Sequence, residues 1–187
     1  MFNLLAPVVL SVTSVGLFGE LFSQPRQRDQ LGVHKGDWLT VSLGLLPGLG
    51  VLAVNVEAWV RGPVDVNPLA FGLGLVLCLA CIVIRTWGKY TLGYYYTFSI
   101  DLRDDHRVIE DGPYRFVRHP IYLGAFLGVA GLPLLAHSWI AVLALTLPTG
   151  FAFGLRLILE DKFLLQNLGD SYREYAGRTS RLIPFVW

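Results

Sequence analysis

The sequence predicts an all-α integral membrane protein with about five transmembrane helices. Hydrophobic residues make up 53% of its 187 residues and charged residues only 16%, and the mean hydropathy is +0.52. The hydrophobic residues gather in long runs that are separated by shorter polar stretches. Soluble domains carry about 25% charged residues, so the lipid bilayer is the expected solvent of this chain.

Five apolar segments follow one another along the chain, at residues 2–22, 38–60, 68–84, 121–136 and 138–159. The first, second and fifth are long enough to cross a membrane as helices that rise about 1.5 Å per residue, whereas the third is of marginal length. The fourth is short and is broken by Pro133, so it predicts a tight helical hairpin with the fifth. No Lys or Arg precedes Arg26, and we therefore expect no removable signal peptide.

Polar residues inside the apolar segments are few. Cys78 and Cys81 form a C-x-x-C pattern, but their neighbours are apolar and no second pair exists, so we interpret them as small buried hydrophobic residues. Glu20 and Glu57 are expected at the membrane interfaces, and the role of Asn55 is open. No spacing of His, Cys or carboxylate residues resembles a zinc or di-iron site, so we expect no metal. The net charge of +1 gives no reason to expect nucleic acid.

The basic residues predict the orientation. If five helices span the membrane with the N-terminus outside, all fifteen Lys and Arg residues except Arg61 face the cytoplasm; Arg85 and Lys89 are counted with the loop after the third segment. The positive-inside rule favours this topology. Residues 85–120 and 160–187 then share the cytosolic side, either of a prokaryotic inner membrane or of the endoplasmic reticulum.

The residues after the fifth segment predict a cytosolic amphipathic helix that lies on the membrane face or over a site, and that Gly177 ends. Its apolar residues recur at helical spacing with charges between them: Phe163, Leu164, Leu168, Tyr172 and Tyr175. By length the chain is one domain, 1–187, with an N-terminal helical pair at 1–60 and a core at 68–187.

The stretch 112–124, GPYRFVRHPIYLG, is the first candidate site. Arg118 and His119 stand directly before a helix that has Pro120 in its first turn, a favoured early position. A helix N-terminus presents N–H groups and a partial positive charge. Such a site suits a carboxylate, for example that of an amino-acid-like cofactor. The alternative is a basic cluster that contacts anionic lipid.

Arg156 and Glu160 form the second candidate site. They are four residues apart, so they share one face of the fifth segment near its cytosolic end. A helix ion pair in this order contributes only about 0.2–0.5 kcal/mol, which is little for an arginine about one turn inside a membrane. We therefore favour a functional role, in which Glu160 accepts from an ammonium group and Arg156 pairs with an anionic substrate group.

With these motifs the chain resembles the isoprenylcysteine carboxyl methyltransferase family and its relatives among membrane phospholipid methyltransferases. The resemblance covers roughly the C-terminal half, and it rests on Trp87, Leu92-Gly93, His106-Arg107-Val108-Ile109, Gly112-Pro113-Tyr114, Arg118-His119-Pro120-Ile121-Tyr122, Arg156, Glu160-Asp161, Gly169, Tyr172, Tyr175 and Ile183-Pro184.

The resemblance implies an integral membrane enzyme that uses S-adenosylmethionine, with residues 68–187 as its cofactor-binding core. Glu160 would bind the cofactor from the last helix, and Arg156 would face the methyl acceptor as its binding and catalytic residue. The implied lining of the cofactor pocket is His106, Arg107, Val108, Ile109, Tyr114, Arg118, His119, Pro120, Ile121 and Tyr122. The chain departs from the family at Asp161, where a second Glu is frequent, and at Ser99, where eukaryotic members have Gln.

The implied reaction is methylation of a carboxylate on a lipophilic, prenylcysteine-like acceptor that enters from the membrane. Transfer from a sulfonium to a carboxylate needs no metal and no general base, only alignment and exclusion of water. Three alternatives stay open: methylation of a phospholipid or another small molecule at N, S or O, an NADPH-dependent isoprenoid or sterol reductase, and a non-enzymatic subunit that binds anionic lipid. Nothing in the sequence implies an oligomer.

Overall fold

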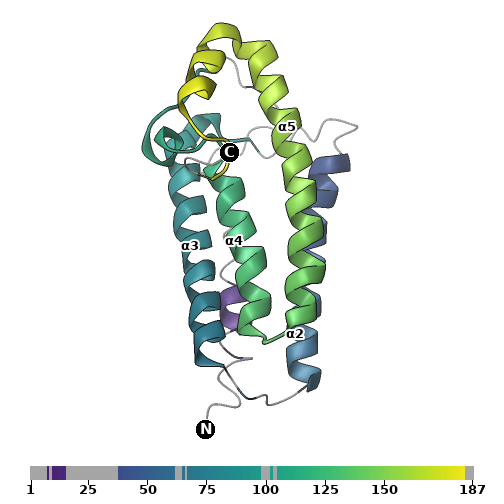
Figure 1. Ribbon diagram of the computed structural model, residues 1–187. Coiled ribbons are helices and arrows are strands. Elements are labelled where there is room, and N and C mark those ends of the chain that lie inside the picture. Colours follow the sequence, from purple (N-terminus) through teal and green to yellow (C-terminus); the bar gives the residue numbers. More distant parts are fainter. Residues whose placement is uncertain are drawn as a thin grey trace.

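The computed structural model describes residues 8, 10–15, 38–61, 65, 67–97, 102 and 105–183. Within these ranges the chain forms the long helices α2 (Trp38–Arg61), α3 (Pro68–Leu92), α4 (Pro120–Leu135) and α5 (Trp139–Arg178), and the short 3-10 helices η2 (Gly93–Tyr95) and η3 (Gly112–Arg115). Figure 1 shows the long helices side by side in an elongated bundle. No strand occurs in these ranges beyond an isolated bridge between Val117 and Ser180.

The outer surface of the bundle is apolar. Among the described residues, Pro68–Tyr95 and Ala141–Arg178 are long and apolar enough to cross a membrane, and α4 is a shorter apolar helix. Rows of exposed residues three or four positions apart run along α3 (Leu69, Leu73, Val76, Leu79, Val83) and α5 (Leu143, Leu147, Phe151, Leu155). Water disfavours such rows and lipid does not. The number of five spans stays a prediction, because most of segment 2–22 lies outside the described residues.

The third apolar segment is longer than predicted. Asn67 caps α3 by accepting hydrogen bonds from two backbone N–H groups, and the helix continues past residue 84 to Leu92. Arg85 and Lys89 are buried in this extension rather than placed in a loop, so the predicted end of the third segment at residue 84 was wrong. The Arg85 Nη1 donates to the Ile121 carbonyl at 3.3 Å, and the Lys89 Nζ lies 5.6 Å from the centre of the Tyr96 ring.

The fourth and fifth segments form the predicted hairpin (Figure 1). Pro133 does not break α4, which continues to Leu135. A proline so close to a helix end removes only one backbone hydrogen bond, and the local packing buries it fully. The turn contains His137 at φ +53°, and the Ser138 hydroxyl accepts from the Ala141 N–H at 3.3 Å to start α5.

Small residues let α3 and α4 approach closely. A Cβ atom on Gly74 would lie 2.9 Å from both the Gly131 carbonyl oxygen and the Leu135 nitrogen, and one on Gly131 would lie 2.9 Å from the Cys78 sulfur. Cys78 and Cys81 form no disulfide bond and are buried, as predicted. Because the hydrophobic effect does not drive helices together within lipid, close packing of this kind is a main source of their association.

Polar residues in α2 pair with neighbouring elements. The Asn55 amide donates to the Ser14 hydroxyl at 2.9 Å. Glu57 accepts from the Ser138 hydroxyl at 2.8 Å and pairs with Arg61. These bonds tie α2 to the described part of the first segment and to the α4–α5 turn, so each polar group at these positions has a partner. Glu20 lies outside the described residues.

The close approach of α3 and α4 can be tested with matched alanine substitutions in one helix. Gly74→Ala should lower the free energy of unfolding by about 1–3 kcal/mol, because the new methyl group meets backbone atoms of α4. Gly72→Ala should raise it by up to about 1 kcal/mol, because nothing lies within 4 Å of that position and alanine favours the helix. Thermal unfolding in detergent measures both, and equal shifts would refute the packing argument.

Candidate functional site

The candidate site lies at the end of the bundle opposite the α4–α5 turn. Past Leu159, α5 continues as a polar helix and bends sharply at Gly169, which has φ +59° and ψ −130°. Glycine is the residue that adopts this conformation without strain. Figure 1 shows the last part of α5 folded back over the ends of α3 and α4. The helix ends at Arg178, one residue after the predicted end, and its contact with a membrane stays a prediction.

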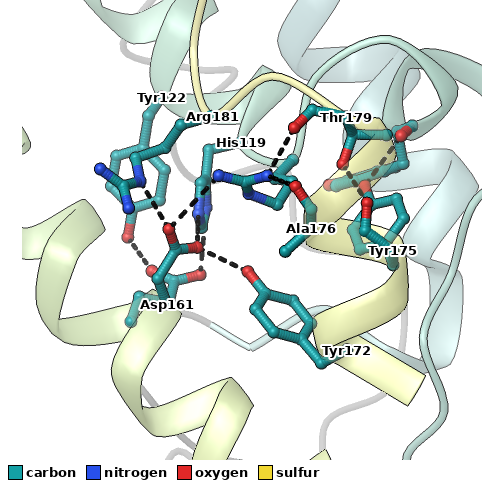
Figure 2. Close-up of polar contacts among 11 residues, drawn as sticks. His119, Tyr122, Asp161, Tyr172, Tyr175, Ala176, Thr179 and Arg181 are labelled. Atoms are coloured by element: carbon teal, nitrogen blue, oxygen red, sulfur yellow. Dashed lines mark hydrogen bonds and ion pairs between the residues drawn. The ribbon is translucent and has the colours of Figure 1, made fainter. Parts of the chain in front are cut away.

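The carboxylate of Asp161 connects the segments that meet at this end (Figure 2). Its Oδ1 accepts from the His119 Nε2 at 2.8 Å and from the Tyr172 hydroxyl at 2.5 Å. Its Oδ2 accepts from the Arg181 Nε at 2.6 Å and lies 3.8 Å from the Arg118 Nη2. Burial alone would raise the pKa of Asp161, but the hydrogen bonds from His119, Tyr172 and Arg181 hold this pKa well below its usual range.

Arg118 attaches the C-terminal segment to the start of α4. Its Nη1 donates to the carbonyl oxygens of Ala176 at 2.6 Å and Thr179 at 2.5 Å, which are carbonyls at the end of α5. The backbone of Arg118 also donates to the Ser180 carbonyl at 2.9 Å. The guanidinium group therefore holds the helix end in place, and its predicted contact with a cofactor stays a prediction.

Tyrosine side chains add to this attachment. The Tyr175 hydroxyl donates to the Tyr114 carbonyl at 2.8 Å, and both tyrosines are buried. Burial raises the pKa of Tyr114, and the nearby charge of Glu160 raises it further. Burial is also the main reason that the pKa of Tyr175 lies above its usual range. Both phenols are therefore neutral hydrogen-bond donors at physiological pH.

The Tyr122 hydroxyl lies between Arg156 and Glu160. The Arg156 Nε donates to this hydroxyl at 2.5 Å, and the hydroxyl donates to the Glu160 Oε2 at 2.7 Å. The edge of the Tyr122 ring also packs against Phe153, with ring centres 5.7 Å apart. Arg156 is only 4% exposed. The two residues that share a face of α5 are thus joined through a residue of α4, which sequence spacing alone could not show.

His119 lies between two consecutive carboxylates of α5. Its Nε2 contacts Asp161, and its Nδ1 is 3.8 Å from the Glu160 Oε1. Pro120, next in the chain, is fully buried, and the Ile121 side chain points toward Gly88 of α3, where a Cβ would lie 2.9 Å from the Ile121 Cγ1. The start of α4 is therefore fixed on both sides.

The predicted residues 106–109 lie before η3. The His106 ring packs edge-on against Tyr95, with ring centres 5.1 Å apart. Its Nδ1 is buried without a hydrogen-bond partner, and burial lowers the pKa of His106 below its ordinary value. His106 is therefore partly buried, although charged residues surround it in the sequence. Arg107 is exposed, and Val108 and Ile109 are partly buried.

The structure thus brings His119, Tyr122, Arg156 and Glu160 into direct contact. The predicted site residues did not include Asp161, although the resemblance covered it as a position where a second Glu is frequent. In the described ranges, no group of three or more His, Cys, Asp or Glu residues is arranged to hold a metal ion.

Comparison with known proteins gives consistent relatives. The profile of the isoprenylcysteine carboxyl methyltransferase (ICMT) family matches residues 73–166. A protein of Oryza sativa subsp. indica named "Probable protein-S-isoprenylcysteine O-methyltransferase" is 33% identical over 116 residues, which is 61% of each chain. The protein-S-isoprenylcysteine O-methyltransferase of Schizosaccharomyces pombe is 33% identical over 82 residues, or 44% of this chain and 35% of the relative.

A solved structure has the same fold. It is that of a eukaryotic intramembrane Ras methyltransferase, an isoprenylcysteine carboxyl methyltransferase, and it matches with a TM-score of 0.65 at 20% sequence identity. The match covers 99% of this chain and 70% of that one. The chain spans 61% of the length of the first curated relatives it matches. Since the family profile covers half of the chain, including α4 and the Arg156–Glu160 turn of α5, the chain belongs to the isoprenylcysteine carboxyl methyltransferase family.

Proposed function

We propose that the chain is an integral membrane methyltransferase that moves a methyl group from S-adenosylmethionine to the carboxylate of a lipophilic, prenylcysteine-like acceptor. The observation that carries this proposal is the Tyr122 hydroxyl, which joins Arg156 to Glu160 at the end of an apolar bundle. A cation and an anion then stand side by side where lipid-soluble and water-soluble ligands can meet. The named activities of the family relatives support the same reaction.

The residues present fit the proposed cofactor. Glu160 and His119 offer acceptors for an ammonium group, and the first turn of α4 offers backbone N–H groups for a carboxylate. The buried Nδ1 of His106 has no hydrogen-bond partner among the residues that the structure describes, and it suits a polar group of a bound ligand. Tyr114, Val108 and Ile109 would line the pocket around it. S-adenosylmethionine, when bound, supplies a methyl group on a positively charged sulfur.

Arg156 is the residue that we assign to the acceptor. Its Nε donates to the Tyr122 hydroxyl, and a guanidinium group is the side chain best suited to pair with a carboxylate. Because Arg156 is buried, a carboxylate paired with it is poorly hydrated, which strengthens the contact and keeps the nucleophile aligned. A carboxylate is already deprotonated at physiological pH, so no side chain has to act as a base. Exclusion of water then protects the transfer.

We further propose a multi-pass topology with the N-terminus outside and the site in the cytosol, with residues 1–60 as a helical pair beside a cofactor-binding core of 68–187. The distribution of charge supports this orientation. Arg61 lies at the end of the bundle near the α4–α5 turn, where its Nη1 donates to the His137 carbonyl. Arg118, Arg178 and Arg181 lie at the opposite end, which the positive-inside rule places in the cytoplasm.

The protein should bind S-adenosylmethionine and its product S-adenosylhomocysteine. At a concentration of about one hundred times Kd, either ligand should stabilise the folded protein by about 2.7 kcal/mol. Isothermal calorimetry and thermal unfolding of the detergent-solubilised protein measure this effect. NADPH serves as the control ligand: a shift with NADPH alone would favour a reductase, and no shift with any of the three would refute the proposed cofactor.

The two charged residues of α5 should differ in kind. Glu160→Gln keeps an acceptor for the Tyr122 hydroxyl but removes the charge, so it should weaken cofactor binding. Arg156→Ala should leave the cofactor Kd nearly unchanged and lower kcat/KM for the acceptor. Loss of a charge-assisted contact of about 1.5–3 kcal/mol corresponds to about ten- to a hundredfold in either quantity. Cofactor titration and methyl-transfer kinetics with a prenylcysteine analogue measure both; wild-type values in both variants would leave only a structural ion pair.

The orientation should appear in cysteine labelling of intact cells. Asp65 and Ser171 are both exposed; Asp65 lies between the end of α2 and the start of α3, and Ser171 lies past the bend at Gly169 in α5. Asp65→Cys should react with a membrane-impermeant maleimide, whereas Ser171→Cys should react only after the membrane is permeabilised. The opposite pattern would reverse the proposed topology.

A further inference from the structure

Asp161 lies directly behind His119 and has no role in the proposed binding of either substrate. We propose that Asp161 is a positioning residue, which holds the His119 ring with its proton on Nε2 so that Nδ1 and the Glu160 carboxylate together receive one ammonium group. That group would be the ammonium of the methyl donor's amino-acid portion, so this inference rests on the proposed function and extends it.

First, the carboxylate of Asp161 is held rigidly. Hydrogen bonds from three directions hold its carboxylate: from His119 before α4, from Tyr172 after the bend at Gly169, and from Arg181 beyond α5 (Figure 2). The Arg118 guanidinium lies 3.8 Å away on the Oδ2 side. A carboxylate with these partners is fixed in position and cannot turn away from the histidine.

The second step concerns the proton between Asp161 and His119. An ionised carboxylate is an acceptor only, so the proton in the 2.8 Å contact belongs to the His119 Nε2. The lowered pKa of Asp161 agrees with an ionised group at physiological pH. In a neutral imidazole one nitrogen is a donor and the other an acceptor. In the neutral form of the ring, the Asp161 contact therefore makes Nδ1 the acceptor.

The third step is the geometry on the other side of the ring. The distance of 3.8 Å between the His119 Nδ1 and the Glu160 Oε1 is too long for a hydrogen bond. A donor placed to one side of the line that joins the two atoms can contact both at about 2.8–3.0 Å. The other oxygen of Glu160 accepts from Tyr122, which fixes its orientation. An ammonium group has three donors and carries the charge that Glu160 favours.

Asp161→Asn tests the tautomer without removing the side chain. An amide can donate to Nε2, which allows the proton to move to Nδ1 and to oppose an ammonium group. The Kd of S-adenosylhomocysteine should rise about tenfold or more, as expected for the loss of a hydrogen bond to a charged group. The Kd of methylthioadenosine, which has no amino-acid portion, should stay within about twofold. Asp161→Glu, which restores a carboxylate, should recover most of the affinity for S-adenosylhomocysteine.

Tyr172→Phe is the matched structural control. It removes another hydrogen bond to the same Asp161 oxygen but leaves the His119 contact, so it should lower thermal stability and change neither Kd. If Asp161→Asn binds S-adenosylhomocysteine like the wild type, or weakens both ligands equally, Asp161 acts only in folding and the inference is wrong. If the wild-type protein binds neither ligand, the proposed function fails and this inference fails with it.

A measurement on the wild-type chain keeps the test independent of whether the variants fold. The chain has four histidines, so nitrogen-15 NMR of histidine-labelled protein can resolve the His119 ring after assignment by substitution. With S-adenosylhomocysteine bound, His119 should show a protonated Nε2 and an unprotonated Nδ1. A protonated Nδ1 in the complex would overturn the proposal even if cofactor binding itself is normal.

Discussion

The partly buried carboxylate of Asp161 is the contact on which the polar end of the molecule depends. An ionised carboxylate next to the apolar part of a helix costs free energy unless other groups donate hydrogen bonds to it or carry a compensating charge. Here the partners are supplied by the start of α4, by the end of α5 and by the segment after it. The charge of Asp161 therefore brings three separate parts of the chain together. Each of these parts lies in or beside the candidate site.

The apolar part of the bundle meets a different constraint. Lipid gives no net driving force for burying leucine between helices, so close contact must come from shape. Gly74 and Gly131 supply that shape between α3 and α4. Large apolar residues are directed outward along α3 and α5 instead. This division lets a small chain hold α4 rigidly, and the rigid α4 fixes where His119 and Tyr122 point.

The sequence predicted the features that depend on local composition. The segments 38–60 and 138–159 and the hairpin follow from hydropathy, because runs of apolar residues form helices in lipid wherever they pack. The predicted end of the third segment, residue 84, was wrong. Hydropathy places charged residues such as Arg85 and Lys89 outside an apolar helix, whereas here α4 and Tyr96 cover them. Hydropathy along a single sequence does not reveal tertiary contacts that bury charged residues.

The sequence predicted part of the candidate site, but not the contacts between its helices. Spacing placed Arg156 and Glu160 on one face, and the structure agrees, but the hydroxyl of Tyr122 between them comes from another helix. The bend at Gly169 depends on a backbone conformation that a helical pattern conceals. Asp161 was missed because its partner His119 lies 42 residues away in the chain, a contact that sequence spacing does not reveal.

The adjacency of Glu160 and Asp161 has a consequence for how this helix can vary. Successive residues of an α-helix point about 100° apart, so one carboxylate faces Tyr122 and the other faces Tyr172 and Arg181. The register of α5 is therefore locked at this turn. A single residue inserted into or deleted from the helix before Glu160 would rotate both carboxylates by about 100°, away from their partners, whereas a change of length beyond the bend at Gly169 would leave this register intact.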